Sequence, residues 1–479
     1  MNNSRRDFLR TSACALGGLA LASTVESLGL VGAYAQSAAD YRALVCVFLN
    51  GGNDGTNAVV PLDDPTFAEY DRVRIGLNNS IGLGIPRANL VAVNPPSQGR
   101  QFGLHPSLAP EVANPSVANK GLLDVWNQGK LAVVCNVGPL VEPLTRTSYL
   151  NGTGKRPLQL FSHSDQISQW QSSIANAASR TGWGGRLADK SAALNGASTF
   201  PQVITIAGIS LFVTGTSALP LALGDSNSTL GAALPLTMTS NSSGSSATDV
   251  ATRRAAFDAL RALDADKVLV KADADTRGSA LQTKSQLDTA PNTDYPKIPN
   301  TTLGRQLEQV ARLVALRDTL GVRRQIFFCQ LGGFDTHSNQ RVAGQDALLL
   351  QVGQALRGFW DTLGDLGVQD NVTTFTLSDF GRTFQPAGSG AAVGTDHGWG
   401  NHHFVMGGAV RGGNFYGTYP TLALGGPDDA DTRGRWIPTT SVEQYAATLA
   451  SWYGLSASDY PAVFPLLDRF PTPNLGFMV

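Results

Sequence analysis

The sequence predicts an α/β protein, a three-layer sandwich in which helices cover both faces of a mostly parallel central sheet. Two observations carry this prediction. Near-continuous apolar runs rich in β-branched and aromatic residues are typical of strands that are covered on both faces. Segments with helical spacing of apolar residues lie between those runs, and this alternation is typical of α/β folds. The chain is also long enough, at 479 residues and 42% hydrophobic, to bury a large core.

The predicted strands follow one another along the whole chain. They occupy residues 43–49, 131–137, 203–209, 325–331, 372–377 and 403–406. Helical spacing occurs at Leu303, Leu307, Val310 and Val314, and again at Leu349, Val352, Leu356 and Phe359. The clearest unit is strand 325–331, a helix over about 345–364 and strand 371–377, which predicts a right-handed crossover. The ends of its two strands should therefore lie at the same edge of the sheet.

Charge and cysteine content exclude several classes of protein. With 36 Lys and Arg against 37 Asp and Glu the net charge is −1, so no polycationic surface is expected to bind nucleic acid. Beyond the amino-terminal segment three cysteines remain, Cys46, Cys135 and Cys329, each within an apolar run. Their odd number and wide spacing argue against a disulfide framework or a zinc knuckle and predict buried, inert thiols.

The first 35 residues resemble a twin-arginine export signal. The sequence SRRDFLR at 4–10 precedes a stretch of small residues, and AYA at 33–35 is a cleavage-site pattern. The stretch is too diluted by polar residues for a stable transmembrane anchor. We therefore expect residues 1–35 to be removed and residues 36–479 to form the mature protein. The resemblance implies the twin-arginine translocation machinery as a partner and a periplasmic or secreted location.

Residues 225–300 differ in texture from the rest of the chain. A Ser-, Thr- and Asn-rich stretch at 225–249 is followed by a charged segment of helical character that includes Asp264, Asp266, Asp273 and Asp275. The pairs of Asp lack the Gly and the closing Glu of a calcium loop, so they indicate a solvated helix face. We expect this segment to be an insertion or cap on the core.

Three aspartates follow predicted strands directly. Asp54 comes after strand 43–49, Asp335 after 325–331 and Asp379 after 372–377, each in a Gly-containing loop. His337 follows Asp335 closely, and His397 lies in another Gly-rich loop before the last strand. Ligand sites in parallel sheets form beyond the carboxyl ends of strands. Carboxylate oxygens and imidazole nitrogens placed there predict a divalent metal site. The alternative is that these Asp residues form ordinary Asx turns and the His residues are structural.

The motifs together resemble a bacterial family of twin-arginine-exported proteins of unknown function, which is placed in the alkaline phosphatase and sulfatase superfamily. They are GGNDG at 51–55, FSHSDQ at 161–166, GWGGR at 182–186, GFDTH at 333–337, SDFGRT at 378–383 and TDHG at 395–398. The resemblance covers essentially the whole mature chain. It implies an alkaline phosphatase-like sandwich.

The resemblance also implies a site. Five residues fall at the positions of the superfamily's metal ligands, namely Asp54, Asp335, His337, Asp379 and His397. The implied cofactor is a divalent metal such as zinc, manganese or calcium. Two places depart from the superfamily pattern. One residue separates Asp335 from His337 where the enzymes usually have three, and Phe380 stands where a His would complete a second metal site.

Two further residues are predicted to act on a substrate. The nucleophile of such enzymes lies at a helix amino terminus, where free N–H groups also hold an anion. Ser162 and Ser164 both precede the predicted helix 166–174, and we assign the nucleophile to Ser162 and an N-cap to Ser164. The alternative is that both serines only cap the helix, and Thr56, two residues after Asp54, is a further candidate nucleophile. Arg382 is assigned to an oxyanion, with a structural ion pair as the alternative.

The sequence thus predicts an exported, metal-dependent hydrolase of phosphoric or sulfuric esters, acting on a small molecule or a polymer. No G-x-S-x-G elbow supports a serine hydrolase instead. The competing prediction is a non-catalytic periplasmic binding or assembly protein that has the same fold and a degenerate site.

Overall fold

The computed structural model describes residues 40–109, 121–232 and 267–479, with scattered positions between 252 and 263. The predicted export signal, residues 1–35, lies outside the described residues. So does most of the first half of the predicted insertion.

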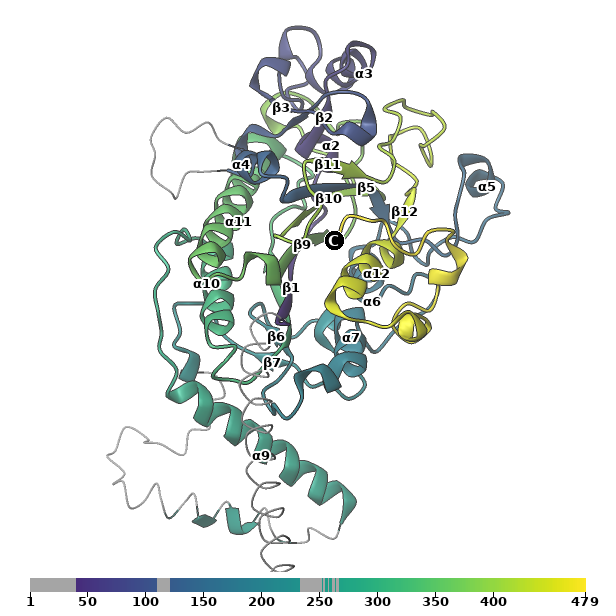
Figure 1. Ribbon diagram of the computed structural model, residues 1–479. Coiled ribbons are helices and arrows are strands. Elements are labelled where there is room, and N and C mark those ends of the chain that lie inside the picture. The colour runs from purple at the N-terminus through teal and green to yellow at the C-terminus, as the bar shows by residue number, and fades with distance from the viewer. Residues whose placement is uncertain are drawn as a thin grey trace, which may run out of the picture. The chain divides into compact units, whose positions relative to one another are not determined.

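A large, mostly parallel sheet forms the middle layer, as predicted (Figure 1). The strand order is β11-β5-β10-β9-β1-β8-β6-β7, with β12 pairing beside β5. Among the described strands of this sheet β10 alone runs antiparallel to its neighbours, β9 and β5. The strands are β1 (Arg42–Leu49), β5 (Leu131–Gly138), β6 (Val203–Thr205), β7 (Leu221–Ala222), β8 (Arg324–Leu331), β9 (Val372–Ser378), β10 (Asn401–Met406), β11 (Asn414–Tyr416) and β12 (Thr440–Ser441).

All six predicted strands are present. The run at 203–209 is shorter than expected, because β6 ends at Thr205 where the Thr205 hydroxyl bonds to the carbonyl of Gly208 and turns the chain. Strands β7, β11 and β12 were not predicted, since segments of two or three residues carry too little periodicity to be recognised.

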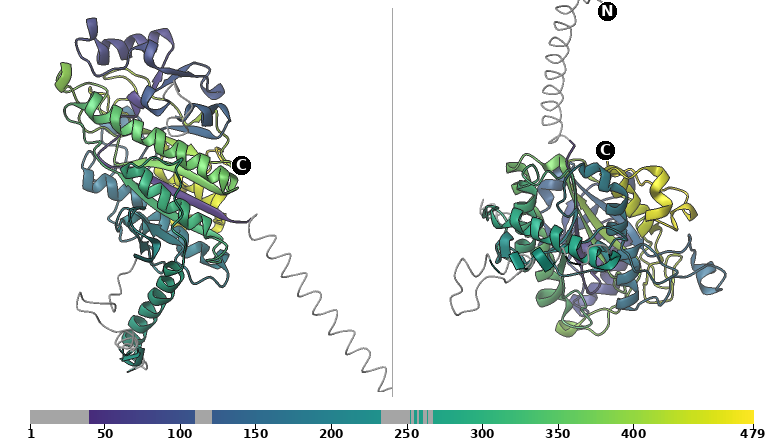
Figure 2. Two further views of the ribbon diagram at one scale, coloured as in Figure 1. Left: turned by 90° about the vertical axis from the view of Figure 1, so that its left-hand side faces the viewer. Right: turned by 90° about the horizontal axis from the view of Figure 1, so that it is seen from below.

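Helices cover both faces of the sheet (Figures 1 and 2). α10 and α11 lie on one face, and α6, α7 and α12 lie on the other. The described helices are α2 (Gly55–Ala58), α3 (Asp64–Tyr70), α4 (Leu123–Asn127), α5 (Arg146–Leu150), α6 (His163–Ser172), α7 (Trp183–Ser191), α9 (Val268–Asp288), α10 (Thr302–Ala315), α11 (Ala347–Asp365), α12 (Val442–Tyr453) and α13 (Tyr460–Val463). None of them combines the length and apolar composition needed to cross a membrane.

The predicted crossover is confirmed as β8, α11 and β9. Both strands run parallel to β1, which lies between them, so their carboxyl ends share one edge. Leu49 at the end of β1 is level with Leu331 of β8 and Ser378 of β9. This alignment places the three loops that follow these strands side by side.

A second, smaller sheet has the antiparallel order β2-β4-β3. Its strands are β2 (Val59–Pro61), β4 (Phe102–Leu104) and β3 (Val91–Val93). It is built from the segment that follows the loop after β1, and it was not predicted from the sequence.

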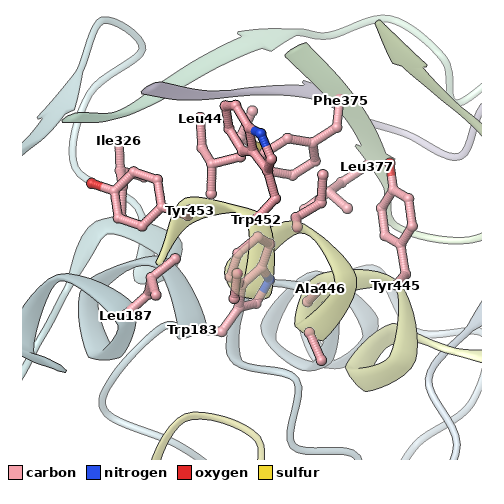
Figure 3. Packing of buried hydrophobic residues seen from close by; sticks show 14 of the residues in the cluster. Leu44, Trp183, Leu187, Ile326, Phe375, Leu377, Tyr445, Ala446, Trp452 and Tyr453 are labelled. Carbon is pink, nitrogen blue, oxygen red and sulfur yellow. The ribbon is translucent and has the colours of Figure 1, made fainter. Parts of the chain in front are cut away.

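The main core lies between the sheet and helices α7 and α12 (Figure 3). Leu44, Ile326 and Phe375 project from three strands toward Trp183 and Tyr445, and all five are fully buried. Each fully buried side chain of this size contributes about 1.5–3 kcal/mol through removal of apolar surface from water. The three cysteines of β1, β5 and β8 are buried and free, as predicted, and burial raises the pKa of each thiol.

α12 begins at Ser441 for a local reason. The Ser441 side chain accepts a hydrogen bond from the Gln444 backbone N–H at 3.1 Å, and the Gln444 side chain accepts one from the Ser441 N–H at 3.0 Å. This capping box satisfies two free N–H groups at the helix start. Gly454 ends the helix in the left-handed conformation, with a φ of 118°.

Glu443, in the first turn of α12, is 1% exposed. Burial raises the pKa of its carboxyl group to about 8, and the nearby positive charges of Arg186 and Arg469 offset the rise only in part. The folded protein therefore keeps a proton that the unfolded chain releases above its ordinary pKa of about 4.3. Between these two values the unfolded state binds fewer protons, so stability falls as the pH rises.

A Glu443→Gln variant should remove this pH dependence. We expect the melting temperature of the variant to match that of the wild type near pH 4.5 and to exceed it at pH 8.5 by at least about 2 °C. A stabilisation of one kcal/mol raises the melting temperature of a domain of 150–250 residues by about 2–4 °C. Thermal unfolding of both proteins from pH 4.5 to 9 measures the difference. A constant difference across that range would contradict the buried, protonated carboxyl group.

Candidate metal centre

The site lies at the edge where β1, β8 and β9 end. Gly51, in the loop after β1, has a φ of 117°, and a Cβ atom there would lie 2.3 Å from the Asp335 backbone nitrogen. Only glycine permits both this conformation and this close approach. The β1 loop can therefore pack directly against the loop that carries Asp335.

Three histidine side chains converge on one carboxylate oxygen. The Nε2 atoms of His163, His337 and His397 lie 3.5, 3.1 and 3.4 Å from Oδ1 of Asp335. The Nε2 atoms of His337 and His397 are 2.9 Å apart. Ligand atoms of His163, Asp335 and His397 all lie within 4.8 Å of one another. We call His163, His337, His397 and Asp335 together the His₃Asp cluster.

The opposite nitrogen of each imidazole is held by a hydrogen-bond acceptor. Nδ1 of His163 lies 2.7 Å from the Asp379 carboxylate, and Nδ1 of His337 lies 3.1 Å from the Asp396 carboxylate. Nδ1 of His397 lies 2.8 Å from the carbonyl oxygen of Phe161, which can only accept a hydrogen bond. Each neutral ring therefore carries its hydrogen on Nδ1 and directs the Nε2 lone pair into the cluster.

This arrangement fits a metal ion. Three lone pairs and a carboxylate oxygen face one another, and Nε2 of His163 is a buried atom without a hydrogen-bond partner in the described structure. Zinc bonds of about 2.0–2.1 Å in a tetrahedron place neighbouring ligand atoms about 3.3 Å apart. The three distances to Oδ1 of Asp335 and the distance between His337 and His397, 2.9 to 3.5 Å, lie around that value, and His163, Asp335 and His397 form a compact ligand group. Histidines whose Nδ1 bonds to a carboxylate or a carbonyl are typical of metal centres.

The backbone of Phe161, whose carbonyl oxygen accepts from His397, has an uncommon conformation. Phe161, two residues before His163, has a φ of 70°, an uncommon conformation for a bulky residue. This conformation is stabilised from outside, because the Arg435 guanidinium lies 4.4 Å from the Phe161 ring and donates from Nε to the His397 carbonyl at 2.8 Å. The segments that carry His163 and His397 are thereby joined.

Arg382 fixes the carboxylate. Its side chain is fully buried, and Nη1 donates to Oδ1 of Asp335 at 3.0 Å. Burial alone would raise the pKa of Asp335, but the charge and hydrogen bond of Arg382 outweigh it, so the pKa lies below its usual range. Nη2 of Arg382 has no hydrogen-bond partner among the described residues. The predicted site residue Arg382 is thus in the site, with Nη1 and Nε used in hydrogen bonds and Nη2 without a partner among the described residues.

The histidines differ in basicity. The hydrogen bond with Asp379 is the largest influence on His163 and raises its pKa. Burial is the largest influence on His397 and lowers its pKa. His397 therefore stays neutral more readily than His163. In the neutral form the Nε2 lone pair of His397 remains available to a metal ion.

Asp379 contacts the cluster indirectly. One of its oxygens accepts from the Gly51 N–H at 2.8 Å and the other lies against Nδ1 of His163. The next residue, Phe380, is buried and stacks on His397, with ring centroids 4.5 Å apart, and lies 4.7 Å from the His163 ring. In this geometry Asp379 orients a ligand, and Phe380 fills the space beside two of them.

Asp54 has no free oxygen. It caps α2 through a 3.3 Å hydrogen bond from Asn57 N–H, and its other oxygen accepts from Arg74 and from Gln340, both at 2.7 Å. The carboxylate is 1% exposed. Binding a metal through Asp54 would require one of these buried bonds to break.

Ser162 occupies the N-cap position of α6. Its hydroxyl donates to the Asp165 carboxylate at 2.7 Å and lies 3.1 Å from the Ser164 hydroxyl. Ser164 lies inside the first turn of α6, so its assignment as the N-cap was wrong, because the helix begins three residues earlier than predicted.

Two residues of the site, His163 and Asp396, were not predicted from the sequence. His163 follows Ser162 in the FSHSDQ motif, and Asp396 precedes His397, so each was adjacent to a predicted residue. The signal was the scarcity of histidine, since half of the six lie in the cluster. Of the others, His402 and His403 are fully buried, and burial lowers the pKa of each to about 3.

Fold and site together define an α/β protein with a His₃Asp cluster at the carboxyl edge of a mostly parallel sheet. The chain belongs to the family described as "Protein of unknown function (DUF1501)", which matches residues 41–431. No curated protein matches it.

Solved structures resemble the chain at low TM-scores. The PsFucS1 sulfatase from Pseudoalteromonas sp. is 10% identical, with 83% of this chain and 68% of that chain covered and a TM-score of 0.28. The lipoteichoic acid synthase LtaP from Listeria monocytogenes is 8% identical, with 84% and 76% covered and a TM-score of 0.28. An alkaline phosphatase variant from the Antarctic bacterium TAB5 is 9% identical, with 76% and 90% covered and a TM-score of 0.25.

Proposed function

We propose that this protein binds one divalent metal ion in the His₃Asp cluster and hydrolyses phosphoric or sulfuric esters outside the cytoplasm. One observation carries the metal site: three imidazole lone pairs, each set by an acceptor on Nδ1, point at one carboxylate oxygen. The resemblance of the motifs to the alkaline phosphatase and sulfatase superfamily supports the ester chemistry.

The donor set favours zinc. Imidazole nitrogen suits zinc, whereas calcium takes six to eight oxygen ligands, and manganese prefers carboxylate and water oxygens. We therefore place zinc first, manganese second and calcium last. When bound, such an ion supplies Lewis acidity to an ester oxygen.

The geometry supports one ion rather than two. Asp54, Asp379 and Asp396 use both carboxylate oxygens in hydrogen bonds or ion pairs with other residues. Among the strand-end carboxylates described, Asp335 faces the three lone pairs. Phe380 also occupies the neighbouring space against His163 and His397 with an apolar ring.

Two side chains are placed to act on an anionic ester. Nη2 of Arg382, which has no partner in the described part of the chain, is available as a donor to a developing oxyanion. Ser162 lies at the amino terminus of the ten-residue helix α6, beside the ligand His163. Asp165 accepts the Ser162 proton in its hydrogen bond and is positioned to act as the base when Ser162 attacks.

The alternative is a metal-binding protein without turnover. The bond between Ser162 and Asp165 favours it, since Ser and Asp in the first turn of a helix commonly pair as structural caps. In that case the cluster would be a structural metal centre.

The experiment that tests the proposal uses natively exported protein. Cells expressing the full precursor are fractionated, the mature chain is purified from the periplasm, and its metal is measured by elemental analysis. We expect a chain that begins near Gln36, one zinc ion per chain, and hydrolysis of an activated aryl phosphate or sulfate.

Three outcomes have distinct meanings. Two ions per chain would contradict the single site. One ion without hydrolysis after supply of zinc, manganese, magnesium or calcium would favour the binding protein. A precursor retained in the cytoplasm would contradict export.

A further inference from the structure

We infer that Thr395, Gln340 and Asp54 form a buried hydrogen-bond relay that positions Arg382 and, through it, the metal-facing carboxylate of Asp335. This inference rests on the proposed metal site, and it gives Asp54 a role that direct metal binding does not describe.

The relay is continuous. Nε of Arg382 donates to the Thr395 hydroxyl at 3.1 Å, and that hydroxyl donates to Oε1 of Gln340 at 2.5 Å. Nε2 of Gln340 then donates to the Asp54 carboxylate at 2.7 Å. At the other end, Nη1 of Arg382 donates to Asp335 at 3.0 Å.

The direction of every bond is determined. Arg382 can only donate, so the Thr395 oxygen must accept from it and turn its own hydrogen toward Gln340. The Gln340 amide must then direct its NH₂ group toward Asp54, which as a carboxylate can only accept. No rotated amide or hydroxyl satisfies both neighbours, so the relay has one arrangement.

The far end of the relay is anchored. Nη1 of Arg74 donates to Asp54 at 2.7 Å, and its Nη2 donates to the carbonyl of Thr383, the residue after Arg382, at 2.9 Å. Arg74 therefore ties Asp54 to the same segment that carries Arg382. The relay side chains are 0 to 2% exposed, and in such an environment polar networks are strong and costly to break.

Two relay residues lie within three positions of a ligand residue in the chain. Gln340 follows His337 by three residues and begins the π-helical turn η10 (Gln340–Asp346). Thr395 precedes His397 by two residues, and its N–H donates to the Thr336 carbonyl at 3.1 Å. A bond between Thr395 and Gln340 therefore joins the loop of Asp335 and His337 to the loop of His397. Loss of the relay should loosen ligands that lie on both loops.

The test compares two substitutions at one position. Thr395→Val keeps the shape of threonine and removes the hydroxyl, whereas Thr395→Ser keeps the hydroxyl and removes the methyl group. Zinc affinity of the full mature chain is measured by competition with a chromophoric chelator, and the melting temperature is measured on the metal-free protein.

We expect Thr395→Val to weaken zinc binding about 10- to 100-fold, the range for partners that orient metal ligands, and Thr395→Ser to restore it. A purely structural role would lower the melting temperature of the metal-free protein and leave zinc affinity unchanged in both variants. That result would overturn the relay while leaving the metal site intact. Absence of zinc binding by the wild type would instead refute the proposed function.

A second pair of variants covers a failure of Thr395→Val to fold. Gln340→Met removes the central amide, and Gln309→Met is its control, because Gln309 is also buried but bonds to Ser228 and Arg312, outside the relay. We expect weaker zinc binding in Gln340→Met only. Equal affinity in the two variants would contradict the relay.

Discussion

Replacing Asp335 with Asn should remove zinc from the protein and abolish ester hydrolysis while the fold persists. Among the described residues, this carboxylate is the anionic group that faces the three Nε2 atoms, and its loss removes the charge that attracts the cation. The Asn side-chain oxygen still accepts from Arg382, so the loop keeps its contact. The affinity for zinc should fall by at least the roughly 10- to 100-fold seen for outer-shell partners. Elemental analysis and chelator competition measure this change.

A surface aspartate provides the control. Asp273 is 61% exposed on α9 and pairs with Arg277 at 2.8 Å. Asp273→Asn should leave zinc content and hydrolysis at wild-type values. Full zinc occupancy in Asp335→Asn would contradict the cluster as the metal site.

His163→Ala and Ser162→Ala should have opposite effects although the two residues are neighbours. Loss of the His163 imidazole removes one of four donors, so zinc affinity should fall at least as far as for an outer-shell partner, about 10- to 100-fold. Loss of the Ser162 hydroxyl should leave zinc affinity unchanged and abolish turnover, because a nucleophile acts on the substrate and does not hold the ion. Zinc titration and an aryl ester assay on both variants separate these effects.

Each arm of this comparison can fail separately. Normal zinc affinity in His163→Ala would remove His163 from the metal centre. Normal turnover in Ser162→Ala would leave the metal site in place and show that another group attacks the ester.

Much of the fold could be predicted because its signals are local. The apolar runs that became β1, β5, β8 and β9 are fully or almost fully buried on both faces, and this is visible as continuous hydrophobicity. The small antiparallel sheet was not predicted, because strands of three residues carry too little periodicity to be recognised, and β2 also depends on a distant partner, as Val60 pairs with Gly103.

The candidate site was predicted in part for the same reason. Asp335, His337 and Asp379 were singled out because they follow strands, and parallel strands bring such loops to one edge. His397 was singled out because it lies in a Gly-rich loop before the last strand. Which side-chain atoms meet there is a different question. Asp54 was predicted to face a metal, yet Arg74, 20 residues away in the chain, holds its carboxylate.

By itself the sequence determined the α/β class, the order of the main strands, the buried cysteines and the edge of the sheet where polar side chains collect, because each depends on neighbours in the chain. Only the tertiary structure decided that the His163 imidazole lies against Asp335 and that Asp379 bonds to the other side of that imidazole. It also decided that the Phe161 carbonyl accepts a hydrogen bond from His397. These roles depend on side-chain direction and on partners 216 and 236 residues apart. Such contacts are set by strand register and loop packing, which leave no periodic pattern in the sequence.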